Sequence, residues 1–239
     1  HGLRADLRWW LRALSEGLGR HGNAIIPTVL NIGAVAHGDA GTEWGIGGVD
    51  ATHFYKAPLP DAVKQAAYRK TRMSSKYLEL YQLLIMARVM GPRWAGMHVM
   101  VHVDNGSLVP LFRKGRSKHA SENEMVREIM LLQALHNWSW TIGWVPREAN
   151  EAADALSKND MRRFWDNVDG ERTQLQVAPH LLRLPSTAQR PRTASGRSSP
   201  RPASACRQHA ANTPACHGSA ASMSSACTQH VSSMLPACH

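Results

Sequence analysis

Cysteine is absent from the first 205 residues of this 239-residue chain, and acidic residues are absent after residue 171. The four cysteines lie at positions 206, 216, 227 and 238, so the preceding chain has no thiols for disulfides or a zinc knuckle. No run of about 18 apolar residues exists, which argues against a membrane partner. An initiator Met and a signal peptide are also missing at His1. We therefore expect an intracellular protein, cytoplasmic or nuclear, and a fragment of a longer polyprotein.

The charge of the chain is strongly basic but unevenly spread. Its 28 Lys and Arg against 18 acids give a net charge of +10, which points to a polyanionic partner. Seven arginines follow residue 171, which leaves 21 basic and 18 acidic residues, or +3, for the rest. Most of the net basicity therefore lies outside the part expected to fold.

Hydrophobic periodicity predicts a mixed α/β domain. The expected order after a first helix is β-β-β-α-β-α-β-α, which predicts three antiparallel strands plus two parallel ones in a five-stranded sheet flanked by helices. The expected helices cover residues 5–14, 75–90, 125–135 and 149–157, and the expected strands cover residues 31–37, 44–49, 53–57, 97–103 and 138–144.

The C-terminal region is rich in Ser, Ala, Pro and Arg from about residue 169. A polar segment at residues 204–217 recurs at residues 225–239 without any apolar period, so we expect a disordered tail. Cys206, His209, Cys216 and His217 are poor candidates for a zinc site, because the repeat lacks Cys-x-x-Cys and an apolar core.

Four acids occupy positions that are locally awkward for a charge. Asp39 and Asp104 end apolar strands, Glu79 lies in the first turn of an apolar helix, and Asp154 is flanked by alanines. An acid at a strand end usually forms a turn, and an acid in the first turn of a helix usually interacts favourably with the helix dipole. If the fold brought them together, they would repel one another unless cations compensated them. Two Mg²⁺ ions about 3.5 to 4 Å apart would suit phosphodiester hydrolysis.

Three local motifs carry a resemblance to a known family. They are YLELYQLL at residues 77–84, VHVDN at residues 101–105 and VPREANEAADALS at residues 145–157. The order of the acids and these motifs resemble the ribonuclease H family, and the last motif resembles the end of the ribonuclease H domain of retrotransposon reverse transcriptases. Residues 6–11 (DLRWWL) and 114–117 (KGRS) are most similar to DIRS-type elements. The resemblance covers roughly residues 5–160.

The resemblance implies a ribonuclease-H-like fold and an enzyme that cleaves the RNA strand of an RNA/DNA hybrid within a reverse transcriptase polyprotein. Asp39 would bridge two Mg²⁺ ions, with Mn²⁺ as a possible substitute. Glu79 and Asp104 would share one ion with Asp39, and Asp154 would hold the other. The expected domains are the end of a polymerase connection segment at residues 1–22, a ribonuclease-H-like domain at residues 23–160, and a linker and tail at residues 161–239.

Nucleic-acid contacts are expected beside these acids. By the same resemblance, Asn105 would touch the minor groove of the hybrid, where 2′-hydroxyls distinguish RNA from DNA. Lys114, Arg116 and Lys118 form a basic run that suits phosphate contacts, although a solvated loop explains it equally well.

Two departures from the family pattern concern the acids. Residues 39–45 (DAGTEWG) replace the usual Asp-Ala-Ser pattern and are one residue shorter before Trp-Gly, which could misplace Asp39. No His precedes Asp154 in the loop where cellular members have one for product release; other retroelement domains also lack it.

Other interpretations remain open. A catalytically silent module that binds nucleic acid or supports a polymerase would fit a decayed element, although all four acids are retained. An exonuclease or integrase fits less well, since an exonuclease needs Asp-x-Glu and Gly41 stands two residues after Asp39.

His98 and His102 are interpreted as structural rather than as metal ligands. The stripe of Trp138, Trp140 and Trp144 is interpreted as core rather than as a base-stacking platform.

Overall fold

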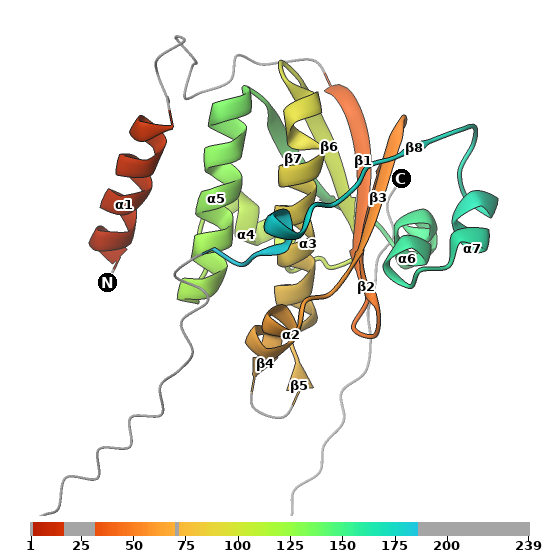
Figure 1. The fold of residues 1–239 in the computed structure, drawn as a ribbon, viewed down its shortest axis with the longest axis horizontal. Coiled ribbons are helices and arrows are strands. Elements are labelled where there is room, and N and C mark those ends of the chain that lie inside the picture. Colours follow the sequence, from red (N-terminus) through yellow and green to blue (C-terminus); the bar gives the residue numbers. More distant parts are fainter. Residues whose placement is uncertain (1, 17–31, 70–71, 186–239) are drawn as a thin grey trace, which may run out of the picture. The chain divides into compact units, whose positions relative to one another are not determined.

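The computed structural model describes residues 2–16, 32–69 and 72–185 (Figure 1). The predicted linker after the first helix, residues 23–31 of the predicted domain and the tail repeat lie outside the described residues. None of the described helices is long and apolar enough to cross a membrane.

The elements are α1 (Gly2–Ser15), β1 (Ile32–Ala40), β2 (Gly45–Asp50), β3 (His53–Pro58), α2 (Asp61–Ala67), β4 (Tyr68–Arg69), β5 (Arg72–Met73), α3 (Ser75–Val89), η1 (Gly91–Trp94), β6 (His98–Val103), α4 (Leu108–Lys114), α5 (Ala120–His136), β7 (Ser139–Trp144), η2 (Arg147–Ala149), α6 (Glu151–Ser157), α7 (Met161–Asp166), β8 (Thr173–Gln174) and η3 (Pro179–Leu182).

The main sheet has the strand order β7-β6-β1-β2-β3-β8. Strands β1, β2 and β3 form an antiparallel meander, and β6 and β7 run parallel to β1. This is the predicted mixed sheet of three antiparallel and two parallel strands, so the predicted fold class is confirmed. The short strand β8 adds a sixth, parallel strand beside β3, which the sequence analysis did not predict.

Helices cover both faces of the sheet (Figure 1). Helix α3 packs on β1 and β2 and contacts α5, whereas α6 packs on β1, β2 and β3. The alternation along β2 separates the two faces, because a Cβ added at Gly48 would meet Met86 of α3 and one added at Gly47 would overlap Leu156 of α6. The absence of a side chain at Gly47 therefore lets α6 approach the sheet closely.

Helix α3 begins where the sequence predicted it. The Ser74 side chain caps its N-terminus by accepting a hydrogen bond of 3.3 Å from the Tyr77 amide. Almost every side chain of the helix is buried, which fits a central helix that is apolar on all sides. Glu79 was expected in the first turn, but the helix begins at Ser75 and has no acidic residue in that turn, so Glu79 lies in the second turn.

The chain continues to pack on the domain beyond the helix expected to be the last ordered one. Phe164 of α7 is fully buried and lies 4.7 Å from the Phe54 ring of β3, measured between ring centroids. Farther on, the Tyr81 hydroxyl donates to the Leu182 carbonyl oxygen at 2.7 Å. Elements α7, β8 and η3 thus lie beyond residue 160, where the domain was predicted to end. Their apolar residues are too few to show a period, so the sequence alone did not reveal them.

Candidate active site

Three of the four predicted acids converge at one edge of the sheet. Asp39 is the penultimate residue of β1, and Asp104 directly follows β6, its parallel neighbour. Parallel neighbours end at the same edge, which brings these two acids together. Glu79 reaches the same edge from α3. One carboxylate oxygen from each of the three acids lies within 4.8 Å of the other two.

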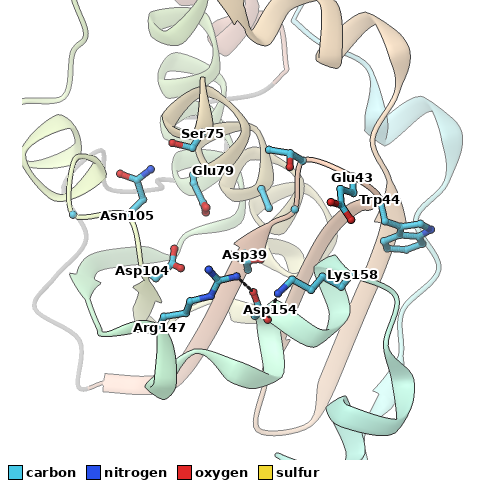
Figure 2. A pocket seen from close by; sticks show the side chains of 14 residues that line it. Asp39, Glu43, Trp44, Ser75, Glu79, Asp104, Asn105, Arg147, Asp154 and Lys158 are labelled. Carbon is cyan, nitrogen blue, oxygen red and sulfur yellow. Dashed lines mark hydrogen bonds and ion pairs between the residues drawn. The ribbon is translucent and has the colours of Figure 1, made fainter. Parts of the chain in front are cut away.

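The acids line a pocket of about 520 Å³ (Figure 2). Asp39 and Glu79 are each 5% exposed, whereas Asp104 is only partly buried. Asn105 and Gly106 continue the wall beyond Asp104, and the remaining lining residues include Glu43, Trp44, Ser75, Arg147 and Lys158. The pocket therefore combines a buried acidic floor with a polar rim.

The shortened turn after Asp39 does not carry it away from the other acids. Asp39 pairs with Gly47 and Ala40 with Ile46 in the antiparallel register of β1 and β2, and the Gly41 amide donates to the Gly45 carbonyl oxygen at 2.8 Å. The Ser157 hydroxyl of α6 also donates a hydrogen bond to the Asp39 carboxylate. The strand register and α6 together hold Asp39 in place.

The acid cluster is electrostatically unfavourable when fully ionised. Burial raises the pKa of Asp39 from 3.8 to about 6, the hydrogen bond from Ser157 opposes this, and the charges of Asp104 and Asp154 add to it. Burial also raises the pKa of Glu79 well above its ordinary value, with further contributions from Asp39 and Asp104. The pKa of Asp104 is raised too, chiefly by burial. Protons or cations must therefore compensate this cluster.

Glu79 shows that the cluster fits a cation. Its Oε2 atom is buried and has no hydrogen-bond partner among the described residues, while the Ala40 amide donates to the carboxylate. A buried acceptor without a donor is unfavourable unless another ligand satisfies it. Carboxylate oxygens are the ligands that Mg²⁺ and Mn²⁺ prefer. The three acids therefore form a donor set that suits a divalent metal ion.

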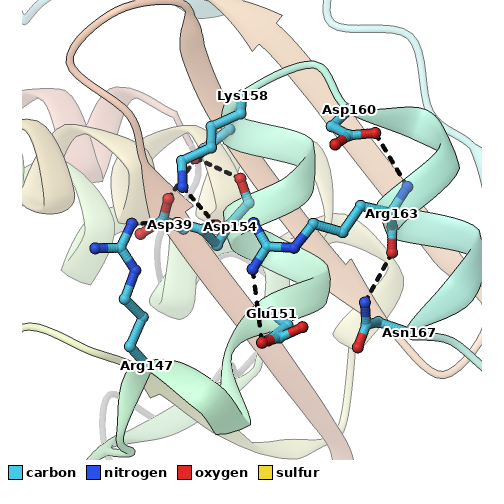
Figure 3. A network of polar contacts seen from close by, with 9 residues as sticks. Asp39, Arg147, Glu151, Asp154, Lys158, Asp160, Arg163 and Asn167 are labelled. Atoms are coloured by element: carbon cyan, nitrogen blue, oxygen red, sulfur yellow. Dashed lines mark hydrogen bonds and ion pairs between the residues drawn. The ribbon is translucent and has the colours of Figure 1, made fainter.

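Asp154 lies in the same pocket but has basic partners (Figure 3). Arg147 donates to Asp154 Oδ1 at 2.7 Å, and Lys158 and Arg163 donate to Oδ2 at 2.7 and 2.6 Å. Burial alone would raise the pKa of Asp154, but the hydrogen bonds from Lys158 and Arg147 lower it below its ordinary value. Asp154 is therefore ionised and paired, and it is not one of the three converging acids.

The basic partners of Asp154 and the hydroxyl of Ser157 were not predicted as site residues. Arg147 and Ser157 both lie inside the VPREANEAADALS motif, but an isolated Arg or Ser in a polar segment gives no signal of its own. Their role depends on η2 and α6 folding back onto the strand ends, which only the tertiary structure reveals.

The predicted nucleic-acid contacts divide into two groups. Asn105 lines the pocket, and its Oδ1 accepts a hydrogen bond of 2.6 Å from the Ser107 hydroxyl. Lys114 ends α4, and Arg116 and Lys118 follow it; all three are exposed and none lines the pocket. The basic run is thus a solvent-exposed segment next to α4 rather than part of the pocket wall.

The histidines of β6 make protein contacts. His98 hydrogen-bonds Ser139 at 2.7 Å and Thr141 at 3.0 Å, and His102 Nδ1 lies 3.4 Å from His37 Nε2. Neither histidine belongs to a group of three potential metal ligands among the described residues. The structural interpretation of His98 and His102 agrees with these contacts.

The tryptophan stripe was interpreted as core, and this is wrong for its last member. Trp138 is buried and Trp140 partly buried, but Trp144 is 57% exposed. The reason is positional: Trp144 is the last residue of β7, which is an edge strand of the main sheet. Its Nε1 atom donates to the Asp104 carbonyl oxygen at 3.0 Å, so it borders the acid site instead.

Comparisons with known proteins give a family match over part of the chain. A family model described as reverse transcriptase-like matches residues 66–160, which include Glu79, Asp104 and Asp154. No curated protein matches the chain.

Similar solved structures are ribonucleases H. One is a ribonuclease H1 isolated from compost by a metagenomic approach, with 19% identity, a TM-score of 0.41, and coverage of 54% of this chain and 96% of that one. A second is ribonuclease H1 from the archaeon Halobacterium salinarum NRC-1, with 16% identity, a TM-score of 0.37, and coverage of 54% and 97%. A third is the N-terminal ribonuclease H domain of a Mycobacterium tuberculosis protein, solved as a fusion with maltose binding protein, with 18% identity, a TM-score of 0.37, and coverage of 57% and 98%.

Proposed function

We propose that this chain is a metal-dependent ribonuclease H that hydrolyses the RNA strand of an RNA/DNA hybrid. The observation that carries the proposal is the convergence of Asp39, Glu79 and Asp104 at the strand ends, with one oxygen of each within 4.8 Å of the others. The reverse transcriptase-like match over residues 66–160 supports it. As the resemblance to retrotransposon domains implies, the natural product would be a reverse transcriptase polyprotein with its polymerase domain, acting inside the cell.

The proposed roles follow from where the acids lie. Asp39, Glu79 and Asp104 would hold one Mg²⁺ ion, and Asp39 and Asp154 would hold a second, with Mn²⁺ as a substitute. Ions bound there would activate a water molecule for attack on the phosphodiester and stabilise the leaving oxygen. Ser157 keeps the Asp39 carboxylate oriented through its hydrogen bond. To accept an ion, Asp154 would have to release Arg147, its only partner on Oδ1 among the described residues.

The substrate contacts are proposed on the rim of the pocket. Asn105, which lines the pocket, would reach the minor groove of a duplex lying across Asp104. Lys114, Arg116 and Lys118 would contact phosphates farther from the cleaved bond, because they lie outside the pocket. Arg147 and Lys158 are the basic residues of the pocket itself.

A second candidate is a catalytically inactive module that only binds nucleic acid. The pairing of Asp154 with three basic side chains favours it, because both carboxylate oxygens are already satisfied. The two candidates differ in one respect only, since the module would bind a hybrid without cleaving it.

Cleavage of labelled duplexes separates the two candidates. We expect the protein to cut the RNA strand of an RNA/DNA hybrid in the presence of Mg²⁺ and to leave duplex DNA and single-stranded RNA intact. EDTA should stop the reaction. Each strand carries its own fluorophore, so that gel electrophoresis shows which one is cut. Binding of the hybrid without cleavage at any Mg²⁺ or Mn²⁺ concentration would favour the inactive module.

Metal binding should depend on pH because the acids hold protons that an ion must displace. The pKa of Asp39 is about 6, and that of Glu79 is raised well above its ordinary value. We expect the Mg²⁺ affinity to rise by up to about tenfold per pH unit for each displaced proton between pH 5 and 7. Calorimetry in two buffers of different ionisation enthalpy measures the protons released. Equal heats in the two buffers at pH 6 would contradict this expectation.

A further inference from the structure

Trp144 is an exposed aromatic side chain at the rim of the acid site. The other tryptophan side chains of its stripe are at least partly buried, whereas 57% of Trp144 is open to solvent. Its position is nevertheless fixed, because the indole Nε1 donates to the Asp104 carbonyl oxygen at 3.0 Å. A large apolar surface held in water at a defined place suggests a binding contact.

The indole lies over the loop that forms one wall of the pocket. A Cβ added at Gly106 would lie 3.5 Å from Trp144 Cδ1, at ordinary van der Waals distance, so the indole lies beside this residue. Asp104, Asn105 and Gly106 all line the pocket. A ligand bound over the acids and extending along Asn105 would therefore meet Trp144 next.

From this position we propose that Trp144 is a nucleic-acid contact that packs its indole face on a nucleotide next to the cleaved bond. The inference rests on the proposed function, since it takes the RNA/DNA hybrid as the ligand. The minor groove of an A-like duplex is wide and shallow and presents sugars and base edges to such a ring. An aromatic contact of this kind is uncharged and does not depend on which base it meets.

A positioning role is the competing explanation, because the same side chain holds the Asp104 carbonyl through its N–H group. Two variants separate the roles. Trp144→Phe keeps an aromatic face and removes the N–H donor, whereas Trp144→Ala removes both. Trp165→Ala serves as the matched control, because Trp165 is 44% exposed on α7 and packs on Phe54 and Phe164, whereas Trp144 is hydrogen-bonded to Asp104.

The test measures binding of a fluorescein-labelled RNA/DNA hybrid by anisotropy in EDTA, at 50 and 200 mM KCl. We expect Trp144→Ala to bind about tenfold more weakly than the wild-type protein, and Trp144→Phe and the Trp165 control to bind within about threefold of it. The salt dependence should be the same for all, because no phosphate contact is lost. Quenching of tryptophan emission by the hybrid should be smaller in Trp144→Phe than in the wild-type protein.

Two results would overturn the inference. The first is an affinity of folded Trp144→Ala equal to that of the wild-type protein. The second, which decides the matter if Trp144→Ala does not fold, is undiminished quenching in Trp144→Phe. A fall in the cleavage rate constant of both variants, at unchanged affinity, would assign Trp144 to positioning Asp104 alone. Because binding is measured without metal, absent cleavage by the wild-type protein would count against the proposed function and not against this contact.

Discussion

Replacing Asp104 by asparagine is expected to lower the rate of hybrid cleavage by about a thousandfold. The neutral amide removes one of the three charges that would bind the ion, and metal-ion catalysis supplies several kcal/mol of transition-state stabilisation. Asp104 is partly exposed at the end of β6, so the change should leave the fold intact. The measurement is single-turnover cleavage of a labelled hybrid at saturating protein.

Glu43→Gln provides the matched control for this prediction. Glu43 lines the same pocket and carries the same charge, but it is exposed and does not belong to the converging acids. Its loss should change the rate by no more than a few-fold. Cleavage unchanged in Asp104→Asn would show that the proposed site is wrong, and equal losses in both variants would show that the pocket needs only general negative charge.

Asp39→Asn is expected to stabilise the metal-free protein while abolishing its activity. The pKa of Asp39 is raised from 3.8 to about 6, so the folded state binds this proton more tightly than the unfolded state does. The stability associated with that proton is present below pH 3.8 and is lost as the pH rises through about 6. A shift of this size corresponds to about 3 kcal/mol at neutral pH. Asparagine carries no such charge and can still accept the hydrogen bond from Ser157.

Urea unfolding in EDTA at pH 7.5 and pH 4 tests this. The free energy of unfolding of Asp39→Asn should exceed that of the wild-type protein by up to about 3 kcal/mol at pH 7.5, and the two should converge near pH 4. Added Mg²⁺ should stabilise the wild-type protein more than the variant. A variant less stable than the wild-type protein at pH 7.5 in EDTA would show that the buried charge of Asp39 is already compensated.

The sequence predicted the parts of the fold that have strong periodic patterns. The alternating valines of β6 and the Ser74 cap of α3 are local signals, and both elements form where they were expected. Elements α2, α4 and the β4–β5 hairpin were not predicted, because each is short and its pattern is weak. Strand β8 pairs through only two residues, Thr173 and Gln174, so no pattern could indicate it.

The candidate site was predictable to the extent that it depends on strand ends. Asp39 lies near the end of one apolar strand and Asp104 directly follows another, and parallel pairing of those strands brings the two acids together. Two partners of Asp154 were not predictable, because Arg147 and Arg163 reach it only when η2 and α7 fold around it. Lys158 lies four residues after Asp154, a local spacing that the sequence analysis did not use. The exposure of Trp144 fits its place at the end of an edge strand, and a stripe of aromatic residues does not show which strand lies at the edge.

The unequal environments of the acids define what metal binding would have to change. Asp39 and Glu79 are buried acids with raised pKa values, so an ion would replace protons there. Asp154 has a lowered pKa, so an ion would replace a basic side chain instead. The ion among Asp39, Glu79 and Asp104 should therefore bind by proton release, and the ion at Asp154 by release of Arg147.

Anomalous diffraction from crystals grown with Mn²⁺ tests the central claim most directly, because it locates the ion independently of any activity. The account predicts a strong anomalous peak among the carboxylates of Asp39, Glu79 and Asp104. A second peak between Asp39 and Asp154, with Arg147 displaced, is predicted at higher Mn²⁺ concentration. Well-ordered carboxylates without an anomalous peak among them at millimolar Mn²⁺ and pH 8 would contradict it.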